Sequence, residues 1–129
     1  MKKYENFCMA LKNLQDIYSY DELYDNVIMT GLVGLFEICF EQSWKAIKEI
    51  LMINGVAESQ TGSPGQILKS AYQVGMIKDE DIWLAALLSR NNVAHAYNKE
   101  IAKDIVNQTK TKYYRMFVDL KTEIEKNWL

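Results

Sequence analysis

Apolar residues recur every three or four positions through most of the chain, which is the spacing of amphipathic helices. Between Lys2 and Tyr18 they form one stripe made of Tyr4, Phe7, Cys8, Leu11, Leu14, Ile17 and Tyr18. Ser19 and Glu22 then fit a capping box, so we expect a second helix to begin there. This helix is predicted to continue to Asn54 and Gly55, which form a C-terminal stop signal.

Gly31 and Gly34 interrupt the apolar pattern inside this second helix. A glycine within a helix costs about 1 kcal/mol relative to alanine, so its presence suggests a neighbour packed close to the backbone. That neighbour is either another helix of the same chain or a second subunit.

A short helix is predicted after a loop from Val56 to Gly62. Ser63 and Gln66 fit a second capping box at its start. Pro64 suits the first turn, because the N–H that proline lacks would have no helical partner there. This helix is expected to end at Gly75.

Two longer helices complete the pattern. Asp79 caps the first, and Asn98 caps the last, whose apolar stripe consists of Ile101, Ile105, Tyr113, Phe117, Leu120 and Ile124. No stretch has the alternation typical of a strand. Long helices with short connections pack as antiparallel neighbours, so residues 1–129 predict one all-α domain, an up-and-down four-helix bundle with an additional short helix.

The most distinctive stretch is Leu84 to Tyr97, with the sequence LAALLSRNNVAHAY. Its helix is almost wholly apolar, and we expect it to carry Ile82, Trp83, Leu84, Leu87 and Leu88 into the core. A helix that is apolar on every side has to be buried against neighbours. The polar residues at its end are therefore expected in a packed interior, a crevice or a subunit interface.

Arg90, Asn91, Asn92, His95 and Tyr97 make up this polar cluster. On a helical wheel Arg90, Ala94 and Tyr97 share one stripe, and Asn91 and His95 share the adjacent stripe. A cation, an imidazole, an amide and a phenol then converge on one small volume, which suits a phosphodiester. His95 is the only histidine, and a lone histidine is more often a satisfied helix-end residue than a catalyst, so a structural role stays open.

Glu37 and Glu41 lie one turn apart on the second helix, and like charges at this spacing are destabilising unless a cation lies near them. One interpretation is a solvated acidic edge, in which Glu41 pairs with Lys45. The other is that Glu37 orients Arg90 or contacts a partner protein.

The charge of the chain restricts its partners. A net charge of −2 argues against nucleic-acid binding through general phosphate neutralisation, so any RNA contact must be local. Either a local RNA contact or a solvated helix face would explain the basic and aromatic residues near the C-terminus: Lys103, Lys110, Lys112, Tyr113, Tyr114 and Arg115.

The sequence contains neither a secretion signal nor an uninterrupted apolar run of about 20 residues, so we expect a cytoplasmic protein without membrane contact. Cys8 and Cys39 lack the spacing of a metal site or a disulfide framework, and we expect both to be reduced core thiols. We expect neither a metal nor another cofactor.

The order Arg90, four residues, His95, one residue, Tyr97 resembles the signature of the HEPN superfamily. Within it, the chain resembles the nucleotidyltransferase substrate-binding proteins and the HepT-like toxins. Two further blocks, Gly31 to Leu51 and Ser63 to Ile77, match the family in the same order, so the resemblance covers nearly the whole chain. It implies the helical bundle, and also a homodimer that brings the two motif helices near a twofold axis.

The first function that this resemblance implies is a HepT-like toxin of a toxin–antitoxin pair. Such a toxin is a metal-independent endoribonuclease, in which His95 would transfer a proton and Arg90 would stabilise charge on the phosphate. Asn91 and Asn92 would orient the phosphate or the imidazole. In the toxin family the position of Tyr97 accepts AMP from a cognate minimal nucleotidyltransferase, the antitoxin, and this addition silences the toxin.

The alternative is a non-catalytic subunit that binds a nucleotide or substrate for a separately encoded nucleotidyltransferase. Arg90, His95 and Tyr97 would then bind phosphate and stack a base without cleaving RNA. The chain lacks the GS and paired-aspartate pattern of the transferase itself, so it is not that catalytic half. A structural dimer with a hydrogen-bonded helix end is a third interpretation. We rank the toxin first, because the arginine, histidine and tyrosine positions are all intact.

Overall fold

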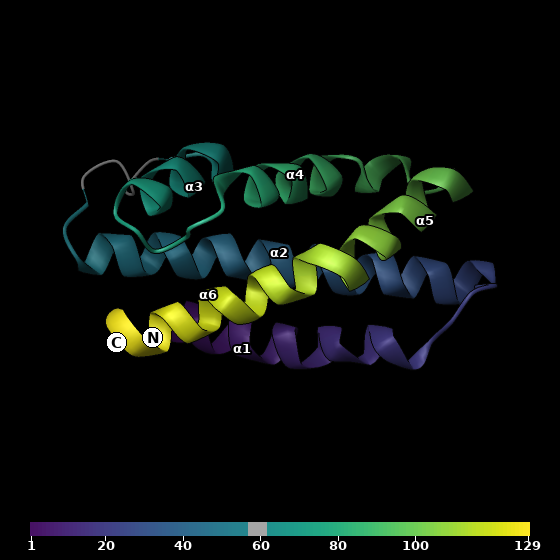
Figure 1. The fold of residues 1–129 in the computed structure, drawn as a ribbon, viewed down its shortest axis with the longest axis horizontal. Coiled ribbons are helices and arrows are strands. Elements are labelled where there is room, and N and C mark those ends of the chain that lie inside the picture. Colours follow the sequence, from purple (N-terminus) through teal and green to yellow (C-terminus); the bar gives the residue numbers. More distant parts are fainter. Residues whose placement is uncertain (57–61) are drawn as a thin grey trace.

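All regular elements in residues 1–56 and 62–129, which the computed structural model describes, are helices (Figure 1). In chain order they are α1 (Lys2–Leu14), α2 (Asn26–Ile53), α3 (Pro64–Gln73), α4 (Glu80–Asn91), α5 (Lys99–Gln108) and α6 (Tyr114–Asn127). The chain reverses direction between α1 and α2, again before α4, and again before α5, so both termini lie at the same end (Figure 1). The predicted all-helical fold class is confirmed for the described residues.

The second helix begins later than the sequence predicted. A 3-10 turn, Gln15–Ser19, continues α1, and the chain is extended after it, so Ser19 does not act as an N-cap. Asp25 caps α2 instead, because its carboxylate accepts a backbone N–H of the first turn at 2.8 Å. The predicted capping box was therefore wrong, and its glutamate, Glu22, pairs with Lys103 of α5 at 3.5 Å.

The later helix starts follow the predicted caps. Ser63 and Gln66 form a capping box at α3, with Pro64 in its first turn. Asp79 caps α4 by accepting a backbone N–H at 3.2 Å, and Asn98 caps α5 in the same way at 2.9 Å. These predictions succeeded because each cap bonds only to the turn that follows it.

Glycines end α2 and α3 as predicted. Gly55 and Gly75 have φ values of 76° and 81°, in the left-handed region that side chains disfavour. Of the predicted loop from Val56 to Gly62, residues 57–61 lie outside the described part of the chain.

A π turn, Thr109–Tyr113, joins α5 and α6 into one continuous helix. Buried residues in this region recur at intervals of four, at Ile105, Thr109, Tyr113 and Phe117. In an α-helix this spacing drifts around the axis by about 40° per step, because each residue turns about 100°. The wider π turn offsets the drift and keeps all four side chains on the buried face.

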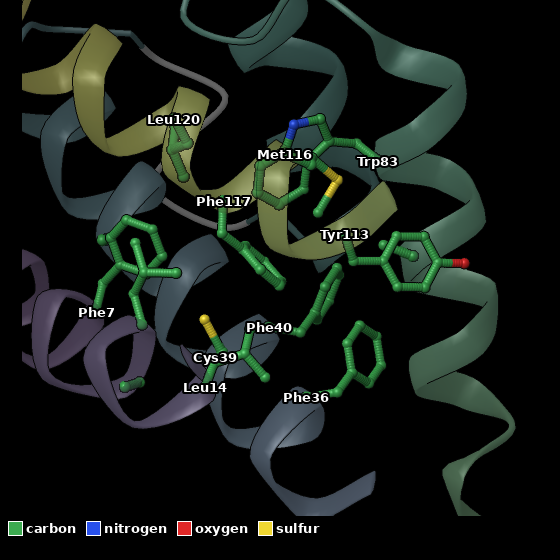
Figure 2. Packing of buried hydrophobic residues seen from close by; sticks show 14 of the residues in the cluster. Phe7, Leu14, Phe36, Cys39, Phe40, Trp83, Tyr113, Met116, Phe117 and Leu120 are labelled. Carbon is green, nitrogen blue, oxygen red and sulfur yellow. The ribbon is translucent and has the colours of Figure 1, made fainter. Parts of the chain in front are cut away.

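Aromatic rings from several helices form the centre of the core (Figure 2). Phe117 of α6 contacts Phe7 of α1, Phe36 of α2 and Trp83 of α4, with ring centroids 6.3, 6.5 and 5.6 Å apart. Phe40 of α2 also meets Trp83, at 6.3 Å. This cluster sets the position of α4 against α2 and α6, and the last turn of α4 carries Arg90 and Asn91 of the predicted site.

Only one side of α4 is buried. Its buried residues, Trp83, Ala86 and Ser89, follow one another at intervals of three. Ile82 and Leu87 are half-buried against the core, whereas Leu88 is 62% exposed. The expectation that this helix is enclosed on every side was therefore wrong, and neither Leu84 nor Leu88 belongs to the core.

The two glycines of α2 have no close neighbour in the described chain. A Cβ atom built on either Gly31 or Gly34 would meet nothing within 4 Å. Of the two interpretations, close packing by another helix of the described chain is therefore wrong. The second, contact with another subunit, stays a prediction.

The cysteine prediction holds in part. Cys39 is fully buried in the core, Cys8 is half-buried, and both are free. Burial raises the pKa of the Cys39 thiol well above its usual range. Among the described residues, no helix has the length and apolar content needed to span a bilayer.

Candidate functional site

The predicted polar cluster lies where α4 ends. The α-helix stops at Asn91, with Asn92 as its C-cap, and a 3-10 turn, Val93–His95, follows. The backbone N–H of His95 donates to the carbonyl of Asn92 at 2.9 Å, which closes this tighter turn. The expected α-helical stripes through His95 and Tyr97 are therefore wrong, because the helical register is lost at Asn92.

Arg90 is held by an ion pair across the helices. Its Nε donates to Oε1 of Glu41 on α2 at 2.5 Å, and the two side chains are 29% and 25% exposed. The other carboxylate oxygen of Glu41 accepts the indole N–H of Trp44 at 3.1 Å. The guanidinium is thus oriented by a carboxylate that is itself held in place.

Glu41, not Glu37, is the glutamate that orients Arg90. Glu37 is half-buried, and neither it nor Lys45 makes an ion pair in the described part of the chain. The two glutamates lie on the same face of α2, so only the position of α4 along α2 decides which one meets the arginine. The expected Glu41–Lys45 pair is replaced by the bond to Arg90.

His95 and Tyr97 lie on the surface. Tyr97 is 86% exposed, and the His95 ring meets it edge-on with ring centroids 6.5 Å apart. No hydrogen bond involves either side chain within residues 1–56 and 62–129, whereas Asn91 accepts a bond from Nη1 of Arg90 at 3.2 Å. The structure therefore brings Arg90 together with Asn91, and His95 together with Tyr97, and records no bond between the two pairs. Asn92 contributes through its backbone, as the C-cap.

Three members of the cluster, Asn91, His95 and Tyr97, are exposed at the protein surface. The structure contains cavities of about 410 and 550 Å³, and neither is lined by Arg90, Asn91, Asn92, His95 or Tyr97. A ligand at the cluster would therefore be bound on the protein surface or between two chains.

Ser89 is a supporting residue that the sequence did not indicate as important. Its hydroxyl is buried and lies 2.8 Å from the hydroxyl of Tyr113 in the π turn. Burial raises the pKa of Tyr113, and the bond to Ser89 partly offsets this effect. This contact holds α4 against the π turn one residue before Arg90. The only available signal was a polar residue inside an otherwise apolar run.

The proposed RNA-binding patch near the C-terminus is not assembled as such. Tyr113 is 2% exposed and cannot stack a base. The Lys110 ammonium donates to the hydroxyl of Tyr24 at 2.7 Å and also to a backbone carbonyl. Arg115 pairs with Asp119 at 3.1 Å. These side chains make contacts within the chain, which favours the structural interpretation.

Fold and cluster together define an all-helical protein that presents an arginine, a histidine and a tyrosine at the end of a half-buried helix. The chain belongs to the nucleotidyltransferase substrate-binding protein-like family, whose model matches residues 2–126. This match confirms the family resemblance drawn from the sequence. No curated protein sequence matches the chain significantly.

Two solved structures have the same fold. A crystal structure from Thermus thermophilus has a TM-score of 0.79 and 23% sequence identity, covering 92% of this chain and 98% of that one. A structure from Haemophilus influenzae, described as the substrate-binding domain of a nucleotidyltransferase, has a TM-score of 0.71 and 20% identity, covering 96% and 95%. At these identities the likeness shows the fold alone.

Proposed function

We propose that this protein is the non-catalytic subunit of a two-component nucleotidyltransferase and binds a nucleotide or substrate for a separately encoded catalytic chain. Its membership of the substrate-binding family supports this function. The order of the two functions inferred from the sequence is therefore reversed: the binding subunit comes first and the toxin second.

The observation that carries this proposal is that His95 is exposed and its side chain makes no hydrogen bond in the described chain. General acid–base catalysis requires a side chain that reaches the transferred proton, and a hydrogen bond from a second group commonly orients that side chain. No second titratable group bonds to His95 among the described residues. Such a residue is suited to binding and stacking more than to proton transfer.

Arg90 supplies the anion-binding group of the proposed site. Its Nε donates to Glu41 and its Nη1 to Asn91, and these bonds fix the orientation of the guanidinium plane. Nη2 and the second hydrogen of Nη1 are left to donate to a phosphate. The exposed rings of His95 and Tyr97 provide faces on which a base can stack. Asn91 and Asn92 offer further polar groups beside the arginine.

We further propose that the protein is a homodimer formed through the outer face of α2. Val27, Gly31, Gly34 and Ile38 recur at intervals of four, three and four on this face, and Val27 and Ile38 are 80% and 55% exposed. This is the spacing of a helix–helix seam, and the glycines permit close approach of a second backbone. Glu41 is the next position of the same stripe, so such a dimer would bring two Arg90–Glu41 pairs toward each other.

The second candidate function is the HepT-like endoribonuclease. The exposed hydroxyl of Tyr97 favours it, since an acceptor for AMP has to be reached by a transferase. In a dimer, two copies of His95 would supply both an acid and a base.

Calorimetric titration with AMP, together with incubation of the protein with tRNA, tests these two functions. For a binding subunit, Arg90→Ala should weaken AMP binding by about 10- to 100-fold, the effect of losing a charged hydrogen bond of roughly 1.5–3 kcal/mol, and tRNA should stay intact. Lys69→Ala changes an exposed lysine of α3 and serves as the control. Cleavage of tRNA by the wild type, lost in His95→Ala, would instead establish the endoribonuclease.

A further inference from the structure

A cavity of about 410 Å³ lies between the start of α4 and the helix α6. Its volume falls within the range of small-molecule sites, roughly 300–1,000 Å³. Its floor is made of buried apolar side chains, among them Trp83, Met116 and Leu120, which lie side by side in Figure 2. None of the residues of the Arg90 cluster lines it. We refer to it as the Trp83 cavity.

Trp83 lines this cavity, and its indole N–H has no acceptor among the described residues. By contrast, the indole N–H groups of Trp44 and Trp128 donate to Glu41 and Glu123. Trp83 is only 3% exposed, and a buried indole N–H usually finds a partner. In Figure 2 the indole nitrogen lies on the side of the ring that faces away from Phe40.

The indole nitrogen of Trp83 is not fully enclosed by protein atoms. In the described chain, the enclosed polar atoms that lack a partner are the Tyr4 hydroxyl and the Gln42 carbonyl oxygen, and the Trp83 nitrogen is not among them. Because Trp83 lines the cavity and is otherwise buried, we expect an acceptor to reach its nitrogen from the cavity side.

Two cationic side chains at the rim of the Trp83 cavity have no acidic partner in the described chain. Each of its three acidic groups is already bonded: Glu123 to Lys78 at 3.5 Å, Asp119 to Arg115 at 3.1 Å, and Asp79 to a backbone N–H as the cap of α4. The remaining rim cations make no ion pair in the described part of the chain. They are Lys112 and Lys126.

The local backbone geometry determines the position of Lys112, one of these two lysines. Lys112 belongs to the π turn that joins α5 and α6, and π turns inside α-helices are frequent at functional sites. The same turn puts Tyr113 on the buried face and leaves Lys112 exposed beside it. The flexible stem of a lysine can carry its ammonium to a ligand held at the cavity mouth.

We propose that the Trp83 cavity binds a small anion with a planar aromatic body. The ring lies on the apolar floor, an acceptor atom of the ligand takes the indole N–H of Trp83, and the carboxylate or phosphate meets Lys112. Of the two unpaired lysines, Lys112 is the nearer to Trp83, since Trp83 packs on Phe117 and Lys126 lies a further nine residues along the helix. Both a simple aromatic carboxylate and a mononucleotide satisfy this chemistry. The site is separate from the Arg90 cluster and does not rest on the function proposed for it.

The indole N–H resonances in a proton–nitrogen NMR spectrum report on the site directly. The protein contains three tryptophans, and Trp44→Phe and Trp128→Phe assign the Trp83 resonance by elimination. Naphthalene-2-carboxylate and AMP are the two probes, and the neutral 2-naphthamide is the control for charge. We expect at least one anion to shift the Trp83 resonance to saturation. The better probe distinguishes a carboxylate site from a nucleotide site.

Lysine variants test the role of the rim. Lys112→Ala removes one exposed side chain and should weaken the better probe by about tenfold, because a charged contact is lost. Lys69→Ala, outside the cavity, should leave its affinity unchanged. Arg90→Ala should also leave it unchanged, so this test and that of the proposed function fail independently. The proposal is overturned if neither anion shifts the Trp83 resonance. It is also overturned if the neutral amide binds as tightly as the anion, or if Lys112→Ala binds the better probe as tightly as the wild type does.

Discussion

Arg90 of α4 and Glu41 of α2 form an ion pair with a 2.5 Å contact between Nε and Oε1, and Trp44 bonds to the second oxygen of the same carboxylate. The motif arginine is therefore part of the packing between two helices as well as a candidate binding group. Any variant of Arg90 has to be evaluated for both effects.

A double-mutant cycle measures the structural part. Arg90→Ala, Glu41→Ala and the double variant should give a coupling energy of about 0.5–1.5 kcal/mol in urea unfolding, because both side chains are largely buried. The Arg115–Asp119 pair is 79% and 64% exposed and provides the matched control, with an expected coupling of about 0.3–0.5 kcal/mol. Equal couplings for the two pairs would contradict the assigned role of Glu41.

The start of α2 is tested by two cap variants. Asp25→Ala should lower the free energy of unfolding by about 1 kcal/mol, since it removes the acceptor for a first-turn N–H. Ser19→Ala should change it by less than about 0.5 kcal/mol, as expected for an exposed residue outside a cap. The opposite ranking in urea unfolding would restore the capping box inferred from the sequence.

The buried bond between Ser89 and Tyr113 predicts a non-additive pair of variants. Ser89→Ala leaves the Tyr113 hydroxyl buried without a partner and should cost about 1–3 kcal/mol. Tyr113→Phe should cost a similar amount, because it leaves the serine hydroxyl unpaired. The double variant removes both hydroxyls and should be more stable than the sum of the single effects predicts. Strict additivity in thermal or urea unfolding would argue against the bond.

Trp44 is half-buried, so replacing it with alanine and with phenylalanine should lower the free energy of unfolding by different amounts. Trp44→Ala should destabilise by about 2 kcal/mol, below the roughly 3–5 kcal/mol of a fully buried tryptophan. Trp44→Phe keeps most of the apolar contact and loses the N–H to Glu41, so it should cost about 1 kcal/mol. A loss below about 0.5 kcal/mol for the alanine variant would place Trp44 outside the core packing.

The open face of α2 gives a test of the proposed dimer. Gly34→Ala should stabilise the folded monomer by up to about 1 kcal/mol, because a Cβ there meets nothing within 4 Å and alanine is the better helix former. Gly34→Leu should leave the monomer folded and abolish dimerisation, since a bulky side chain keeps a second backbone away. Sedimentation distinguishes the two states. A dimer of unchanged affinity in Gly34→Leu would place the interface elsewhere.

Much of the helical framework was predictable from local sequence. The caps at Ser63, Asp79 and Asn98 and the stop at Gly55 were all correct, because a cap bonds only within its own turn. The family was also predictable, because its motifs are short and ordered along the chain.

Two errors near helix ends arose where local signals competed. Ser19 and Asp25 are both suitable N-caps, and the 3-10 continuation of α1 decides in favour of Asp25. Likewise the apolar run before Arg90 gave no sign that the helix stops at Asn91, since no glycine or proline marks the stop. As a result, His95 and Tyr97 lie off the stripe that the helical spacing predicted.

The sequence alone could not identify the ion-pair partner of Arg90. Glu37 and Glu41 are equivalent in charge and lie on the same face of α2, so only the placement of α4 along α2 selects Glu41. The exposure of Leu88 is decided in the same way, by which side of α4 meets the aromatic core. Hydrogen bonds within a turn are fixed by residues a few positions apart, and the sequence by itself determined those. Burial and ion pairing between helices depend on their rotation and axial offset, which result from the packing of the whole core and were decided only by the tertiary structure.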